Sequence, residues 1–295
     1  MSNQNLASAM TSNLTGCFVQ TPVGALQLQS VIGSGSFGSV YKAEVIDGEE
    51  ESQRYAVKVV SRHSEHNAAK FHYEADVLDW LRRERQHPHI IGYHGCLVPQ
   101  EDANFGLLFF DLAPFGSLLS LMEDQGSSIA AHQAWNIFEQ ILDGLAFMHS
   151  EKIFHNDIKP ENILVKKPGS IQIADFGLAI HSGSCGDVPM NYGTGTTSCH
   201  PPEFFASGEF EADRGDLWAA TITLVFLVTY ECPWFQADEF QDFHYNQFKN
   251  GDFPEEYWGQ LEEHKDEVIS FLADDPGERE IPSFYSDRLE KYQKS

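Results

Sequence analysis

Side chains that can transfer protons and bind phosphate are concentrated in the segment His155-Asn-Asp-Ile-Lys-Pro-Glu-Asn-Ile-Leu-Val165. Asp157 could accept the proton of a hydroxyl group, and Lys159 could offer positive charge to a phosphoryl group in transfer. Asn162 offers an amide oxygen to a hard cation such as Mg²⁺. A polar surface loop is the alternative interpretation, and the acidic residue of the next motif, Asp175, argues against it.

Asp175 supplies a second oxygen ligand for a cation. It follows an apolar run at residues 171–174 that reads as a strand, and Phe176 and the flexible Gly177 come directly after it. Two protein oxygens combined with the oxygens of a bound phosphate suit Mg²⁺, with Mn²⁺ as an alternative. The two motifs together predict phosphoryl transfer assisted by a divalent cation.

Lys58 stands in an apolar, strand-like segment. In the simpler interpretation, its ammonium group extends from a sheet edge to water. A buried ammonium that binds nucleotide phosphates would instead need a carboxylate partner, because an unpaired buried charge is costly. Glu74 meets this need, since it shares the apolar face of a predicted helix with Phe71 and Leu78.

A glycine-rich segment runs from Gly33 through Gly35 and Gly38 to Val40. Glycines let the backbone approach phosphate oxygens and donate N–H groups to them. The pattern alone is weak, because it also occurs in dinucleotide-binding proteins. There a helix would follow directly, whereas residues 39–45 read as a strand, so the loop is predicted to join two strands.

The elements that must position these residues change type along the chain. Strand-like alternation dominates residues 26–60, with a hairpin tip predicted at 47–53, and apolar runs at 90–98 and 106–112 complete a small sheet. Residues 66–86 have helical periodicity. Residues after 113 are mainly helical, for example at 134–149 and 217–229, with short strands at 163–165 and 171–174. Two lobes joined near residues 112–115 are therefore expected.

The chain is strongly acidic, with a formal net charge of -25 over 295 residues. Nucleic acids and anionic membranes would be repelled, so neither is expected as a partner. Basic peptides would be attracted, although an acidic surface that only aids solubility is the simpler interpretation. The apolar run at 219–228 is too short to span a bilayer, so no membrane span is expected. Residues 1–20 lack a signal-peptide pattern and are expected to form a disordered tail.

Five cysteines, an odd number without Cys-x-x-Cys spacing, favour reduced thiols. A cytoplasmic or nuclear location, or both, is therefore expected.

These motifs, in this order and at these separations, resemble the eukaryotic-type serine/threonine protein kinase superfamily. Three later segments also match it: Pro201-Pro-Glu203, Asp216-Leu-Trp218 and Asp275-Pro-Gly-Glu-Arg279. The resemblance covers residues 26–288 and implies an α+β fold of two lobes. A small antiparallel sheet with one major helix would occupy 26–112, a larger helical lobe 113–288, and a C-terminal tail 289–295.

The resemblance implies a role for each residue already identified. Asp157 would be the catalytic base beside Lys159, Asn162 and Asp175 would hold Mg²⁺, and Lys58, paired with Glu74, would bind ATP phosphates. In the same way Glu203 would pair with Arg279.

A set of residues would surround ATP: Ile32, Gly33, Gly35, Gly38, Val40, Ala56, Lys58, Phe110, Asp111, Ala113 and Leu164. Phe110 would lie behind the adenine, and backbone groups of Asp111 and Ala113 would bond it. On sequence alone, Phe110, Val40 and Leu164 could equally be core residues.

The implied reaction is transfer of the γ-phosphoryl group of ATP to serine or threonine hydroxyls of protein substrates, because Lys159 and Thr196 match the Ser/Thr pattern. Three positions depart from it. Asn156 stands where many kinases have an arginine that receives an activation-segment phosphate, and Pro201 and Cys199 alter the peptide-docking segment.

Two rival interpretations remain open. A pseudokinase scaffold would bind nucleotide without turnover, and erosion of Lys58, Asp157, Asn162 or Asp175 would be expected, but all four are present. A small-molecule phosphotransferase would share the lobes and the catalytic aspartate but generally lacks the Asp-Phe-Gly and Pro-Pro-Glu motifs.

Overall fold

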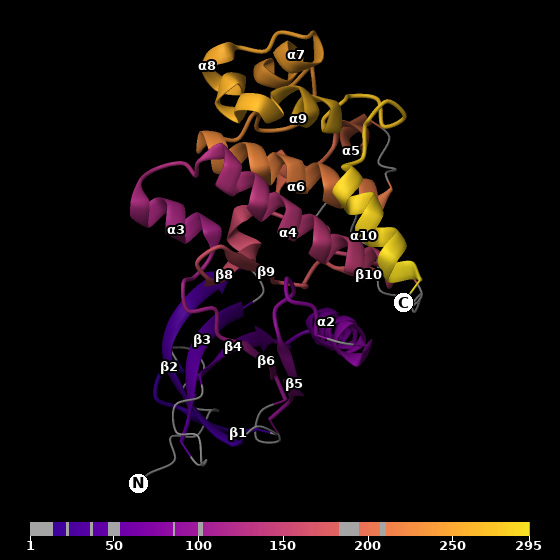
Figure 1. Cartoon of the computed structure of the whole chain (residues 1–295). Helices are drawn as coiled ribbons and strands as arrows, with labels where there is room; N and C mark the ends of the chain where they lie inside the picture. The colour runs from indigo at the N-terminus through magenta and orange to yellow at the C-terminus, as the bar shows by residue number, and fades with distance from the viewer. Residues whose placement is uncertain are drawn as a thin grey trace. The chain divides into compact units, whose positions relative to one another are not determined.

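The computed structural model describes residues 14–21, 24–35, 38–46, 54–84, 86–99, 103–182, 195–206 and 211–294. The chain divides into two compact units (Figure 1). The first comprises residues up to Gln86 and Ile91–Ala113, and the second comprises His87–Ile90 and Pro114 onward. The boundary between the units thus falls after Ala113. The short segment His87–Ile90, which follows the helix of the first unit, belongs to the second unit.

The first unit is built on a six-stranded antiparallel sheet with the order β1-β2-β3-β4-β6-β5. Alternate side chains of the strands are buried, for example Tyr41, Ala43 and Val45 of β3, and they form the core of this unit. The strands are β1 Phe18–Thr21, β2 Gly24–Gly35, β3 Gly38–Val45, β4 Arg54–Ser61, β5 Tyr93–Leu97 and β6 Phe105–Asp111. The hairpin tip predicted at 47–53 lies outside the described residues.

Among the described residues of the first unit, one helix, α2 (Glu65–Glu84), accompanies the sheet. Its apolar stripe, which includes Phe71 and Leu78, is buried, as the helical periodicity predicts. Phe71 lies against Gly106 of β6, where a Cβ atom would come 2.4 Å from the phenylalanine ring. Gly106 therefore allows the helix to approach the sheet, and this packing fixes the face that carries Glu74.

The expectation of a disordered tail over residues 1–20 is wrong for residues 14–20. β1 pairs with β2, and Cys17 and Val19 are buried against the sheet. The backbone N–H of Leu14 donates to the hydroxyl of Tyr41 at 3.1 Å. Burial of this short segment compensates for the loss of its conformational freedom, and residues 1–13 lie outside the described residues.

The second unit is largely helical around two long helices, α4 (Ala131–Ser150) and α6 (Ala212–Thr229), which pack on each other. The remaining helices are α3 Leu118–Gln125, α5 Pro202–Ala206, α7 Phe243–Lys249, α8 Glu255–Trp258, α9 Lys265–Phe271 and α10 Ser283–Gln293, with 3-10 turns η1 Pro160–Asn162, η2 Thr197–Cys199 and η3 Gly259–His264. In the described part of the chain, no helix combines the length and apolar character that crossing a bilayer requires. The predicted fold class, a small antiparallel sheet with one major helix and a larger helical part, is confirmed.

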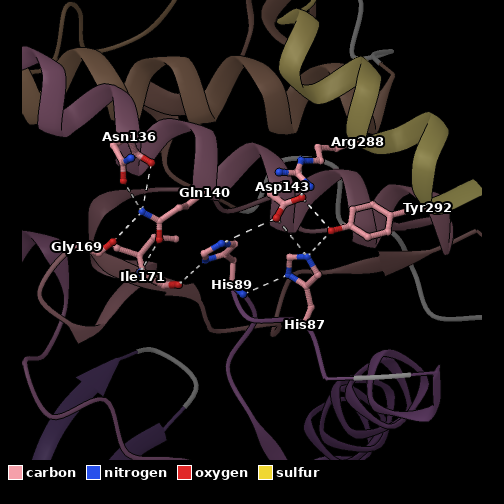
Figure 2. Close-up of polar contacts among 9 residues, drawn as sticks. All are labelled: His87, His89, Asn136, Gln140, Asp143, Gly169, Ile171, Arg288 and Tyr292. Atoms are coloured by element: carbon pink, nitrogen blue, oxygen red, sulfur yellow. Dashed lines mark hydrogen bonds and ion pairs between the residues drawn. The ribbon is translucent and has the colours of Figure 1, made fainter.

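Two short antiparallel strand pairs in this unit flank the segments at 155–162 and 174–179. β8 (Ile163–Lys167) pairs with β9 (Ser170–Ile173), and β7 (Ile153–Phe154) pairs with β10 (Ile180–His181). Gln140 of α4 holds the first pair, because it donates to the carbonyl of Gly169 at 3.0 Å and accepts from the N–H of Ile171 at 3.1 Å (Figure 2).

A polar cluster joins α10 to α4 and to residues 87–90 (Figure 2). The Tyr292 hydroxyl donates to Asp143 at 2.9 Å and lies 2.8 Å from Nε2 of His87, and Arg288 lies 3.4 Å from the same carboxylate. The prediction of a C-terminal tail at 289–295 is wrong for residues 289–293, because these contacts hold them in α10 (Ser283–Gln293). The chain continues as helix there because Tyr292 is bound to the rest of the unit.

Candidate active site

Lys58 and Glu74 form a buried ion pair in the first unit. The Lys58 ammonium on β4 donates to the Glu74 carboxylate on α2 at 2.6 Å, and the two residues are 7% and 5% exposed. The interpretation of Lys58 as an exposed lysine is therefore wrong, and the predicted pair is present. Removing one partner would take this ion pair away from a charge that stays buried, which is costly.

The glycine-rich segment is a β-hairpin between β2 and β3, in which Gly35 pairs with Gly38. Gly38 has φ +146°, and a Cβ atom there would lie 2.0 Å from the carbonyl oxygen of Val59. No other residue fits this position without moving β4. Ile32, at the start of the hairpin, is 49% exposed, and Gly33 pairs with Val40.

Three of the residues predicted to surround adenine lie on the neighbouring strands β3, β4 and β6. Val40 lies opposite Lys58, and Ala56 lies opposite Phe110 on β6. Phe110 is buried, with its ring 5.5 Å from that of Tyr93, so it packs in the core of this unit. Its role toward adenine stays a prediction.

Asp111 has a contact that the sequence did not reveal. Its carboxylate lies 2.7 Å from Nε2 of His94 on the adjacent strand, and its backbone N–H donates to Gly92 at 2.8 Å. A Cβ atom at Gly92 would come 2.4 Å from this carboxylate. The side chain of Asp111 is therefore held beside β5. Ala113 is the last residue of this unit.

In the second unit the structure brings Asp157, Lys159 and Asn162 together. The Asp157 carboxylate accepts from the Lys159 ammonium at 2.9 Å and from the Asn162 amide at 2.9 Å. Thr196 completes the group, since Lys159 donates to its hydroxyl at 2.9 Å and that hydroxyl donates to Asp157 at 3.2 Å. Burial lowers the pKa of Lys159, but the hydrogen bond and charge of Asp157 outweigh it, so the pKa is raised and the lysine stays protonated.

Asp216 of α6 positions this loop. Its carboxylate accepts from the backbone N–H groups of His155 at 2.7 Å and Asn156 at 2.8 Å, and it lies 2.9 Å from Nε2 of His149. The residue is 1% exposed, so these hydrogen bonds act in a dry environment where they are strong. The sequence identified Asp216 only as a landmark, because its partner His155 lies 61 residues earlier in the chain.

Asn156 has a left-handed backbone, with φ +61°, a conformation that asparagine tolerates better than most residues. Its amide donates to the carbonyl of Phe154 at 3.4 Å and to that of Leu178 at 3.3 Å. It thereby links the loop of Asp157 to the segment after Asp175 without an added phosphate.

Asp175 also has a left-handed backbone, with φ +63°, which is uncommon outside glycine. The neighbouring Phe176 is buried with its ring 5.3 Å from that of His155, and the backbone N–H of Ala174 donates to the carbonyl of Asn162 at 2.9 Å. These contacts hold Asp175 and Asn162 on neighbouring parts of the same unit. Leu164, in the strand β8 that follows Asn162, pairs with Gln172 of β9.

The residues present fit a magnesium ion. Both amide hydrogen bonds of Asn162 go to Asp157, to its carboxylate and its backbone carbonyl, so the amide oxygen is the atom left to face a cation. Asp175 adds a carboxylate, and hard oxygen donors of these two kinds are what Mg²⁺ prefers.

Glu203 and Arg279 support the segment that carries Thr196. Two parallel hydrogen bonds of 2.9 Å join them, and the guanidinium lies 4.6 Å from the Trp218 ring centroid. Such a bidentate pair fixes orientation as well as adding energy. Burial raises the pKa of the nearby Cys199 thiol to about 12, so the thiol stays protonated.

Comparison with known proteins agrees with this arrangement. The chain matches the family model described as a protein kinase domain over residues 26–281. The chain belongs to the protein kinase family. This kinase domain is 29% identical over 214 residues to mitogen-activated protein kinase kinase kinase 17 of Arabidopsis thaliana, covering 72% of this chain and 54% of the relative.

Other relatives are also kinases. Mitogen-activated protein kinase kinase kinase 18 of Arabidopsis thaliana is 32% identical over 214 residues, covering 70% of this chain and 59% of the relative. A probable myosin light chain kinase of Dictyostelium discoideum is 28% identical over 257 residues, covering 85% and 78%. The chain spans about half the length of several of the curated relatives that it matches.

Proposed function

We propose that this kinase domain is an active protein serine/threonine kinase that transfers the γ-phosphoryl group of ATP to hydroxyl groups of protein substrates. The observation that carries the proposal is the network of Asp157, Lys159, Asn162 and Thr196, in which the Asp157 carboxylate accepts hydrogen bonds from the other three residues. A domain that had lost turnover would not need to keep this network.

Asp157 is the base in this proposal. Its carboxylate accepts the proton of the substrate hydroxyl as the oxygen forms a bond to the γ-phosphorus and the bond to the β-phosphate oxygen breaks. The products are ADP and a phosphorylated side chain. Lys159, whose raised pKa keeps it protonated, stabilises the negative charge of the transferring group.

Each unit contains residues with a proposed role toward the nucleotide or its cation. The buried Lys58, oriented by Glu74, binds phosphate oxygens, and the glycine hairpin offers backbone N–H groups to them. Asn162 and Asp175 would hold Mg²⁺, which supplies positive charge to the phosphates when bound.

Asp157→Asn tests the assignment of the base. The variant keeps the shape and the hydrogen bonds to Asn162 but cannot take up the proton. Nucleotide binding should stay within about twofold, and turnover should fall by the roughly 10²–10⁴-fold typical of a lost acid–base group. Asp287→Asn, on the exposed side of α10, is the matched control. Turnover of Asp157→Asn at the parent rate with saturating ATP would show that another group is the base.

A further inference from the structure

Three phenylalanines, Phe235, Phe240 and Phe243, are unusually exposed in the second unit, and we call them the phenylalanine platform. They are 74%, 87% and 71% exposed, whereas the other exposed large apolar residues in the described part of the chain range from 36% to 49%. Single exposed apolar residues are normal, but three in nine residues of sequence need a physical reason.

The backbone of the platform is held rigidly by Asp242. This buried carboxylate accepts four backbone N–H groups, from Phe235 at 2.7 Å, Gln236 at 3.3 Å, His244 at 2.9 Å and Tyr245 at 3.0 Å. The same carboxylate therefore fixes the start of the loop and the first turn of α7. Aromatic side chains on a fixed backbone lose little entropy when a partner binds, which favours tight recognition.

Neighbouring aromatic residues of the same segment are buried. Trp234 is 2% and Tyr245 is 1% exposed, and their rings lie 4.9 Å apart at 81°. The fold therefore sorts the aromatic residues of this segment into a buried set and an exposed set. The backbone N–H of Asp242 donates to the carbonyl of Asp238, which closes the turn that carries Phe240 directly before α7. The Asp242 carboxylate, bound to the N–H groups of both Phe235 and His244, brings the start of the loop next to the start of α7.

The apolar area of the platform is large enough to bind a protein segment. With about 200 Å² for each phenylalanine, the exposed fractions correspond to roughly 450 Å² in total. This equals the largest apolar patch of a typical monomer, which is often functional.

Charges around the platform indicate the chemistry of the partner. Residues 231–252 contain one basic side chain, Lys249, and four acidic side chains besides the buried Asp242. Lys249 is already paired, at 2.9 Å from Glu239 and 3.2 Å from Asp274. A second copy of this chain, with its net charge of -25, would be repelled. A basic segment would be attracted.

We propose that the phenylalanine platform is a docking site for a segment of a partner protein that combines lysine or arginine with large apolar side chains. The apolar side chains would cover the three rings, and the basic side chains would lie over the surrounding carboxylates. This binding does not depend on phosphoryl transfer, so it can be tested whether or not the domain is catalytically active.

The test uses the full chain and a fluorescein-labelled synthetic peptide of alternating leucine and lysine pairs, followed by fluorescence anisotropy at about 150 mM salt, where exposed charges are screened beyond about 8 Å. Control peptides carry glutamate in place of lysine, or glutamine in place of leucine. The variants are Phe240→Ala/Phe243→Ala and the more soluble Phe240→Gln/Phe243→Gln. Phe18→Ala, which removes another exposed phenylalanine in the first unit, is the control protein.

We expect the leucine–lysine peptide to bind the parent chain and Phe18→Ala equally, and both double variants at least about tenfold more weakly, as for aromatic hot spots. Both control peptides should bind weakly. Equal affinity for the parent and the double variants would overturn the proposal, because binding would then be diffuse attraction to an acidic protein. A dimer in sedimentation experiments that the double variants lose would also overturn it, because the occupant would then be a second copy of the chain. Peptide binding that appears only after deletion of residues 1–13 would overturn it as well, because the occupant would then be the chain's own N-terminus.

Discussion

Thr196→Val removes a hydroxyl that connects the two charged groups of the catalytic loop. In the parent this hydroxyl accepts from Lys159 at 2.9 Å and donates to Asp157 at 3.2 Å. Valine has nearly the same shape, so the fold should be kept while both hydrogen bonds are lost. Asp157 and Lys159 would still contact each other directly at 2.9 Å.

The magnitude follows from these two bonds. A hydrogen bond to a charged group contributes about 1.5–3 kcal/mol. Because the site is only partly buried and one of the two hydrogen bonds is long, we assign about 1.5–3 kcal/mol to the two hydrogen bonds together. If this energy orients Asp157 in the transition state, kcat should fall roughly 10- to 100-fold, at 1.36 kcal/mol for each factor of ten.

The assay is steady-state phosphorylation of a basic protein at saturating ATP, with thermal melts to confirm folding. Thr196→Ser keeps the hydroxyl and should retain kcat within about threefold. The KM for ATP should change little in either variant. If Thr196→Val matches the parent in kcat, or if Thr196→Ser is as impaired as Thr196→Val, the hydroxyl does not position the base and the reasoning is wrong.

Three further predictions address other parts of the account. Lys58→Met should lower the free energy of unfolding by about 3–5 kcal/mol because the buried Glu74 loses its ion pair with Lys58, and adding Glu74→Leu should restore much of it in urea melts; equal stability of all three proteins would contradict a buried pair. Asp175→Ala should abolish the increase in ATP-induced thermal stabilisation that Mg²⁺ gives, whereas an unchanged increase would exclude it as a ligand. Phosphatase-treated enzyme, shown by mass spectrometry to be unmodified between 175 and 203, should keep activity within a few-fold of the untreated enzyme, because Asn156 already bonds Leu178; a loss of two orders of magnitude that rephosphorylation restores would contradict this.

The parts of the site predicted from sequence are those with local spacing. Asp157, Lys159 and Asn162 lie close together in the sequence, so their proximity in the structure follows from their positions. The inward orientation of Glu74 follows from the 3.6-residue period of α2. The Lys58–Glu74 pair could be predicted because an inward charge must be compensated. The small sheet and the helices α2, α4 and α6 follow from strong, long periodic patterns.

The parts that the sequence did not predict depend on contacts distant in the chain. Asp216 and Thr196 reach Asp157's loop from α6 and from the segment after residue 194, and no spacing rule connects them. β1 has only two buried side chains, Val19 and Thr21, so its alternation is too short to distinguish from a tail. The last turns of α10 are polar, and only the contact of Tyr292 with Asp143 reveals why they stay ordered.

The central claim is that this kinase domain transfers phosphate to serine or threonine. The most direct measurement is incubation of the chain with γ-labelled ATP and Mg²⁺, in separate reactions with a basic protein and with an amino sugar, followed by identification of the labelled residue. We predict label on serine and threonine of the protein, absent with Asp157→Asn. Nucleotide binding without any transferred label would indicate a pseudokinase, and label on the amino sugar alone would indicate a small-molecule phosphotransferase; either result would contradict the account.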